Sequence, residues 1–178
     1  MILIGIDPGM HGAIAVKSRA GIRLYNIPTV TVKGKTDVDF RSLSNILRSI
    51  NDLRTATTKV YIACEKSQAM AFHKTTNAKA FHDSGVSEWK KGYNYGALRA
   101  MFICYNLPYT ATPRPGDWKR RLKLTDSKLT DKEKKDKARC MAMELFPEFI
   151  PALKHQTDSD KAEALLLIVW LEKELRLK

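Results

Sequence analysis

Two carboxylates in this chain come directly after apolar runs of the kind that form buried strands. The run 2–6 ends at Asp7, and the run 60–64 ends at Glu65. In open α/β sheets, ligands collect beyond the ends of the strands. If the two strands are neighbours, Asp7 and Glu65 meet at that end, where two buried carboxylates are costly unless a cation lies against them.

A third group of acids lies near the C-terminus, in the stretch Asp158-Ser159-Asp160-Lys161-Ala162-Glu163. Asp160 and Glu163 are three residues apart, so a helix places them on one face. Carboxylate oxygens gathered in this way suit Mg²⁺ or Mn²⁺ better than zinc. Asp158 is a possible alternative ligand, and which of the three acids complete the site is left open.

Each acid also has a purely structural interpretation. Asp7 precedes Pro8-Gly9 and could make an Asx hydrogen bond within a turn. Glu65 could be the first solvated residue after its strand. Acids near residue 160 suit the first turn of a helix. The ordered set, in an otherwise basic chain, favours a metal site over three separate structural roles.

Alternating strands and helices must position these acids. The nearly continuous apolar run 60–64 is typical of a strand covered on both faces. The pattern predicts one α/β domain over residues 1–178, with a mixed sheet and helices on both of its faces. The expected elements are strands 2–7, 12–17, 22–27, 60–64 and 109–112, helices 38–53, 95–106, 132–146 and 159–175, a short helix around Trp118, and a long loop over 66–94.

The chain is strongly basic, with 31 Lys and Arg against 19 Asp and Glu, a formal net charge of +12. This surplus favours a polyanionic partner, and nucleic acid above all. Lysines around 132–137 are expected to belong to a solvated helix face. The preferred DNA-binding candidates are Arg114, Lys119, Arg120, Arg121 and Lys123, with Lys90 and Lys91 in the long loop.

No apolar run reaches the roughly 18 residues of a membrane span, and no signal peptide is recognisable. We therefore expect a soluble protein that is not exported and has no membrane partner.

The ordered acids resemble a known family. Asp7-Pro8-Gly9 before Gly12-Ala13, Glu65 at a strand end and Asp160-Lys161-Ala162-Glu163 at the start of the last helix are similar to the RuvC-like Holliday junction resolvases of phage type, within the RNase H-like nuclease superfamily. Thr112-Pro113 and Trp118-Lys119 resemble a later segment of the same family. The likeness extends from residue 1 to about residue 172. Glu163 stands where many bacterial members carry Asp.

The resemblance implies an RNase H-like, five-stranded mixed sheet and a metal-dependent endonuclease. Asp7, Glu65, Asp160 and Glu163 would hold two Mg²⁺ or Mn²⁺ ions per active site, with Asp7 as the shared ligand. Hydrolysis of the phosphodiester would leave 5′-phosphate and 3′-hydroxyl ends on a four-way junction or other branched DNA. Lys161 could contact the scissile phosphate or be an ordinary helix lysine.

The resemblance also implies a location in the cytoplasm of a bacterial or phage-infected host cell, a homodimer and a wedge. Met70 or Phe72 could open the junction by unstacking bases, or anchor the loop. Leu98, Met101 and Phe102 of the middle helix could form the dimer face or belong to the core. Two other functions stay open: an RNase H-like nuclease acting on RNA–DNA hybrids, and a non-catalytic nucleic-acid-binding protein of the same fold.

Overall fold

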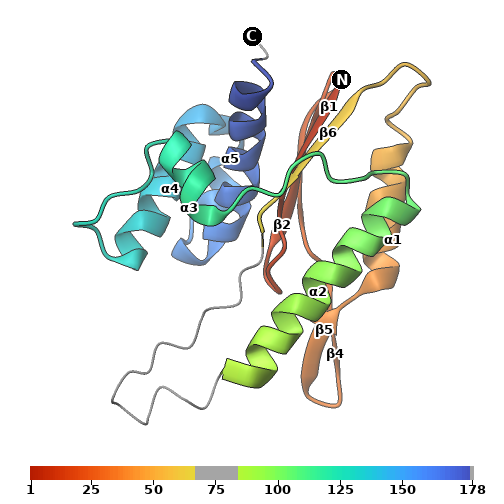
Figure 1. Cartoon of the computed structure of the whole chain (residues 1–178), viewed down its shortest axis with the longest axis horizontal. Coiled ribbons are helices and arrows are strands. Elements are labelled where there is room, and N and C mark those ends of the chain that lie inside the picture. The colour runs from red at the N-terminus through yellow and green to blue at the C-terminus, as the bar shows by residue number, and fades with distance from the viewer. Residues whose placement is uncertain (67–83, 177–178) are drawn as a thin grey trace.

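A mixed β-sheet lies at the centre of the molecule (Figure 1). The computed structural model describes residues 1–66 and 84–176. The sheet has four strands in the order β3-β2-β1-β6, in which β1 is antiparallel to β2 and parallel to β6. Two further strands, β4 and β5, form a separate antiparallel hairpin. The bounds of the strands are β1 Ile2–Asp7, β2 Ala13–Ser18, β3 Gly21–Asn26, β4 Thr29–Val32, β5 Lys35–Val38 and β6 Val60–Cys64.

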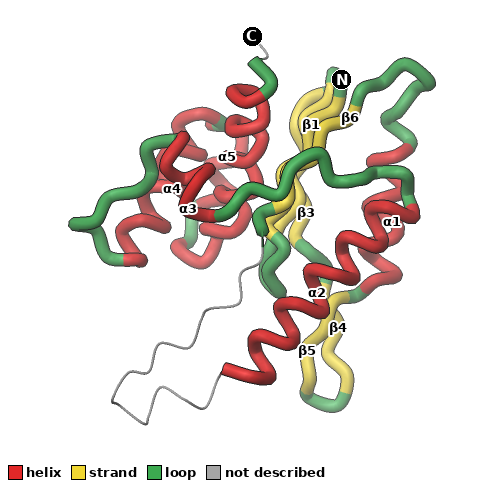
Figure 2. The backbone as a smooth tube through the Cα atoms, viewed as in Figure 1, coloured by secondary structure: helices red, strands yellow, loops and turns green. Residues whose placement is uncertain are grey.

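Helices cover both faces of this sheet, as Figure 2 shows in red on either side of the yellow strands. One face carries α1 (Phe40–Asn51) and α2 (Ser84–Cys104). The other carries α3, α4 and α5 together with two short 3₁₀ helices. The bounds of this second group are α3 Pro115–Arg121, α4 Asp131–Leu145, η2 Pro147–Leu153, η3 Gln156–Asp158 and α5 Ser159–Glu174. Among the helices of the described residues, none is long and apolar enough to cross a membrane.

The alternation of side chains along β1 divides the core into two parts. Ile4 and Ile6 are fully buried against α1 and α2. Leu3 faces the other way, into the cluster formed with α5. Because successive residues of a strand point to opposite faces, Asp7 lies on the same face as Leu3. The strand therefore directs its terminal carboxylate towards α5.

Gly5 lets α5 pack directly on β1. A Cβ atom at this position would lie 2.1 Å from the carbonyl oxygen of Ala164 and 2.9 Å from the Cβ of Leu167. Any larger side chain would force the helix away from the strand. The absence of a side chain at residue 5 thus fixes the distance between the end of β1 and the first turns of α5.

The α/β class with a mixed sheet and helices on both faces is confirmed, but in the described residues this sheet has four strands rather than the expected five. Residues 109–112 make only an isolated parallel bridge between Ala111 and Ala63. The Thr110 hydroxyl accepts the Ile62 N–H at 3.0 Å, in place of a backbone carbonyl. A side chain thus replaces one backbone partner in the pairing with β6. Pro108 and Pro113 bound the segment, and it does not form a regular fifth strand.

The expected loop over 66–94 is also wrong in its second half, because α2 begins at Ser84. The inward positions of this helix include the buried polar Asn94 before the apolar Leu98 and Phe102. Farther towards its N-terminus, Trp89 and Tyr93 are exposed. The first half of α2 therefore lacks the apolar stripe on which a helix prediction depends.

The expected dimer face on this helix is not exposed as a whole. Leu98 and Phe102 are fully buried against the sheet, and Met101 packs partly against the same cluster. Leu98 and Phe102 therefore belong to the core, which is one of the two interpretations made from the sequence.

Candidate functional site

The ends of β1 and β6 bring Asp7 and Glu65 together. The two strands are parallel, and Ile6 pairs with Cys64. Asp7 and Glu65 are the residues that follow this pair along each strand. The Glu65 N–H donates to the Ile6 carbonyl at 2.9 Å and continues the pairing. Tyr61 and Ala63 of β6 face the α5 side, and alternation places Glu65 on that side too. Both carboxylates therefore lie at one sheet edge, facing one helix.

The first turns of α5 supply two more carboxylates at the same place. Asp160 and Glu163 precede Ala164, whose backbone touches β1 at Gly5. Glu163 is only 4% exposed. A buried acid on an otherwise apolar helix face requires compensation by a cation or a hydrogen-bond donor.

The three other acids lie close enough to Asp7 to act on its carboxyl group electrostatically. Burial is the main reason that the pKa of Asp7 rises from 3.8 to about 8. The negative charges of Asp160, Glu163 and Glu65 contribute to the same rise. Residues more than 150 positions apart in the chain thus act on one carboxyl group.

A hydrogen bond from the following turn partly offsets this effect. The Gly9 N–H donates to Asp7 Oδ1 at 3.0 Å, which is the Asx-type bond considered from the sequence. Gly12 closes the turn, since a Cβ atom there would lie 2.1 Å from the Asp7 carbonyl oxygen. Asp7 therefore has the structural role and also belongs to the cluster.

Two adjacent residues of α3 contact two of the acids. Trp118 Nε1 donates to Glu65 Oε2 at 2.7 Å, and Lys119 Nζ pairs with Glu163 Oε1 at 2.8 Å. Burial raises the pKa of Glu65, while the Lys119 charge and the Trp118 hydrogen bond oppose that rise. Burial lowers the pKa of Lys119, but the charges of Glu163 and Glu65 outweigh it and leave this pKa above its ordinary value.

Asp160 is the most accessible acid of α5 in the cluster, with a side chain that is 27% exposed. It accepts a hydrogen bond from the Ser159 hydroxyl at 3.1 Å. Lys135 of α4 approaches to 3.8 Å, at the long end of the range for an ion pair. Asp160 thus retains more freedom than Glu163 to accept a new ligand.

Asp158 is engaged elsewhere. Its Oδ2 accepts the His155 N–H at 2.8 Å, and its Oδ1 pairs with Lys161 at 2.8 Å. Partial burial raises the pKa of Asp158, but these bonds outweigh it and lower this pKa below its ordinary value. Asp158 and Lys161 thus form a local pair at the start of α5.

The donor set suits a hard divalent cation, but the side chains do not yet converge on one. Within residues 1–66 and 84–176, no three His, Cys, Asp or Glu side chains are arranged to hold a metal ion. Glu65 is held by Trp118 and Glu163 by Lys119, which accounts for this arrangement. Lys119 and Lys135 pair with two of the four carboxylates, so the negative charge of the cluster exceeds the positive charge of these two lysines.

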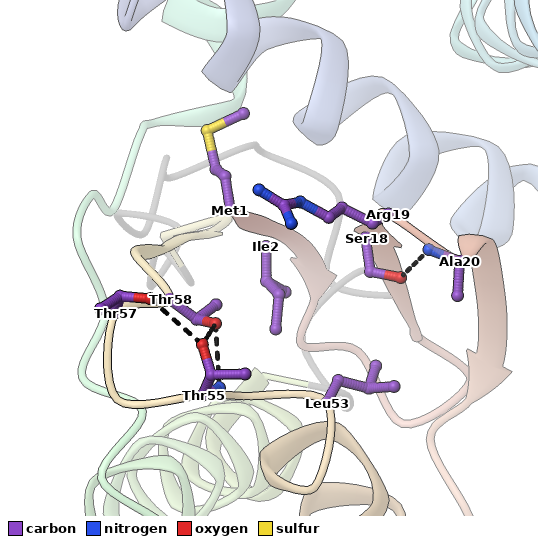
Figure 3. A pocket seen from close by; sticks show the side chains of 9 residues that line it. All are labelled: Met1, Ile2, Ser18, Arg19, Ala20, Leu53, Thr55, Thr57 and Thr58. Atoms are coloured by element: carbon purple, nitrogen blue, oxygen red, sulfur yellow. Dashed lines mark hydrogen bonds between the residues drawn. The ribbon is translucent and has the colours of Figure 1, made fainter.

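A cavity of about 720 Å³ opens beside Asp160. It lies between the turn after β1 and the start of α5, and Lys135 and Lys161 are among the residues that line it. A smaller hollow of about 230 Å³ lies at the opposite end of β1 (Figure 3). Its lining contains Arg19 and hydroxyl groups but no acid, and Thr55 and Thr58 hydrogen-bond to each other there. Of these two hollows, the larger one adjoins the cluster.

The remaining basic candidates lie in the α3 region and in α2. Arg114, Arg120, Arg121 and Lys123 of the α3 region are exposed. Arg114 directly follows Pro113, whose carbonyl accepts the Lys66 N–H at 2.9 Å next to Glu65. Lys90 and Lys91 lie in the first half of α2 rather than in a loop. Met70 and Phe72, the wedge candidates, lie outside the described residues.

Lys123, two residues after the end of α3, has a backbone conformation that disfavours a side chain. Its φ is +59°, and Leu124 N–H donates back to the Lys119 carbonyl at 2.8 Å, as in a Schellman motif. We expect Lys123→Gly to stabilise the fold by about 0.5–1 kcal/mol, because glycine adopts this φ without strain. If Lys123 contacts phosphate, the same change lowers the salt slope of DNA binding by about one. Denaturant unfolding and a salt titration of binding test the two effects, and an unchanged slope would exclude Lys123 from the DNA surface.

Sequence reasoning missed the roles of Trp118 and Lys119 in the cluster. Trp118 is fully buried, and a buried indole N–H requires an acceptor. This requirement was a signal in the sequence that Trp118 has a hydrogen-bond partner, but it did not identify Glu65 as that acceptor. No model of a known protein family matches this chain, and no curated protein sequence matches it.

Proposed function

We propose that the protein is a metal-dependent endonuclease of the RNase H-like fold that cleaves four-way junctions or other branched DNA. The observation that carries the proposal is the placement of Asp7, Glu65, Asp160 and Glu163 at one end of two adjacent strands, close enough for the other three charges to act on Asp7. The net charge of +12 supports a polyanionic substrate. The reaction would leave 5′-phosphate and 3′-hydroxyl ends.

The four carboxylates would hold two Mg²⁺ or Mn²⁺ ions, with Asp7 as the shared ligand because the other three acids all act on it. Such ions, when bound, activate a water molecule and stabilise the leaving oxygen of a phosphodiester. Trp118 would orient Glu65 through its N–H bond, as an outer partner of a ligand commonly does.

The basic residues would hold DNA against an acidic site that repels it. Arg114 follows Pro113, which bonds to Lys66 at the end of β6. Arg120, Arg121 and Lys123 are exposed in or just after α3, where Arg120 and Arg121 also pair with Asp117 and Glu174. Contacts of this kind bind phosphates without reading sequence. A second copy of the chain would give the two-fold symmetry that matches a four-way junction, in a homodimer that can cut both sides.

One observation favours a second function. Lys119 already neutralises Glu163, as expected if the site had lost its metal and become part of a non-catalytic nucleic-acid-binding protein. Binding of branched DNA without divalent-dependent cleavage would support this alternative.

The deciding experiment incubates the protein with end-labelled four-way junction, fork, RNA–DNA hybrid and linear duplex, with Mg²⁺, Mn²⁺ or a chelator. We expect symmetric nicks near the branch point, dependent on a divalent cation and lost with Glu65→Gln. Cleavage of the RNA strand alone would show that the protein is an RNase H-like nuclease acting on RNA–DNA hybrids. Absence of cleavage on all four substrates, with intact DNA binding, would contradict the nuclease proposal.

A further inference from the structure

Lys119 occupies the position of a cation within the acid cluster. Its ammonium lies 2.8 Å from a Glu163 oxygen, although the two residues are 44 positions apart in the sequence. The Glu163 side chain is only 6% exposed, and that of Lys119 is 27% exposed. This is therefore a largely desolvated ion pair, unlike the exposed pairs Arg120–Asp117 and Lys134–Asp131.

The fold holds this ammonium in place through its neighbours. Trp118 is fully buried in the core and anchors α3 beside Glu65. The Lys119 ammonium also lies 5.2 Å from the centre of the Trp118 ring, within the range of a cation–π contact. The Lys119 carbonyl accepts the Leu124 N–H that closes the helix. Backbone and side chain of this residue are thus both fixed at the site.

We propose that Lys119 is a resident counterion of the acid cluster, and that a divalent cation binds there only by displacing its ammonium from Glu163. This inference rests on the proposed metal site and adds a requirement to it. An ammonium and a divalent ion repel each other strongly at a few ångströms in a partly desolvated site. The Glu163 carboxylate therefore cannot keep its ion pair with Lys119 and also bind the metal ion strongly.

Substitution of Lys119 tests the displacement through binding rather than activity. In calorimetric titrations with Mn²⁺, we expect Lys119→Met to bind at least about tenfold more tightly than the unaltered protein, because no ammonium competes. Lys119→Arg keeps the charge and should bind no more tightly than the unaltered protein. Lys135→Met removes the 3.8 Å partner of Asp160 and should have a much smaller effect, as the matched control.

A second measurement uses the unaltered chain, so that it does not depend on the folding of a variant. Amine acetylation followed by peptide mass spectrometry reports how accessible each lysine is. We expect the labelling rate of Lys119 to rise several-fold when Mg²⁺ is added. Lys17, paired with Glu172 at 2.6 Å at the other end of α5, should keep its rate.

The outcomes separate this inference from the proposed function. If Mg²⁺ or Mn²⁺ binds but neither Lys119 labelling nor the affinity of Lys119→Met changes, the resident counterion is overturned and the metal site stands. Binding by Lys119→Met alone would support the inference most strongly. If neither protein binds a divalent cation at millimolar concentration, both the inference and the metal-dependent function are overturned.

Discussion

Replacing Asp7 by Asn is expected to abolish DNA cleavage and, at the same time, to stabilise the metal-free protein. The carboxylate at this position is crowded by three other acids, which is unfavourable for the fold and useful for holding a cation. Asn keeps the size of the side chain and can still accept the Gly9 N–H bond, but it carries no charge. We expect cleavage to fall by about three orders of magnitude, because the shared ligand of a metal site would be lost.

The sign of the stability change depends on pH. The folded-state pKa of Asp7 is raised from 3.8 to about 8, so the folded state holds a proton that the unfolded chain releases. The stability linked to this proton is present in full below pH 4 and is lost as the pH rises through 8. The Asp7→Asn variant has no titrating group at this position, so its stability does not fall with rising pH for this reason. At pH 9 we expect the variant to be more stable by about 2 kcal/mol, and at pH 4 to differ little.

Asp158→Asn provides the control with the opposite sign. The pKa of Asp158 is lowered by Lys161 and His155, so its charge contributes stability above its unfolded pKa. We expect Asp158→Asn to destabilise the protein at neutral pH. Urea unfolding with chelator present, at several pH values, measures both variants. A destabilised Asp7→Asn at pH 9 would show that its carboxylate is not crowded by the other acids.

Replacing Gly5 by Ala is expected to damage both the fold and the site. The new methyl group would lie 2.1 Å from the Ala164 carbonyl oxygen, in a region where backbone meets backbone. Neither element can yield by a side-chain rotation, so α5 must shift away from β1. We expect a loss of about 2–4 kcal/mol in the free energy of unfolding. Divalent-dependent cleavage should fall further than the folded fraction does, because Asp160 and Glu163 move with α5.

Gly116→Ala is the matched control for this experiment. Residue 116 lies in α3, and a Cβ atom there meets no other atom within 4 Å. Alanine favours a helix over glycine, so we expect a neutral or slightly stabilising effect. Urea unfolding and the junction assay compare the two variants. Full stability of Gly5→Ala would contradict the close packing of α5 on β1.

The strand ends and the final helix were readable from the sequence because local patterns determine them. The apolar runs before Asp7 and Glu65 predict two strands, and the parallel pairing of their central residues places the acids side by side. The spacing of Asp160 and Glu163 predicts one helix face. Their convergence on Asp7 also depends on Gly5, whose packing role no local pattern reveals.

Other features depend on tertiary contacts that a local pattern does not encode. The fifth strand was expected at 109–112, but the Thr110 hydroxyl replaces a backbone partner there. The early start of α2 was hidden by exposed aromatic and polar residues. Lys119 was expected at a DNA-binding surface, yet it pairs with Glu163, which lies far along the chain. A basic run shows where positive charge lies but not which of its members turns inward.

Divalent-cation binding to the isolated protein tests the central claim most directly. Titration calorimetry with Mn²⁺ at pH 8 should show saturable binding, to two ions per chain, that weakens at least about tenfold in Asp7→Asn. Equal binding by the two proteins would show that Asp7 is not a ligand and would contradict the account.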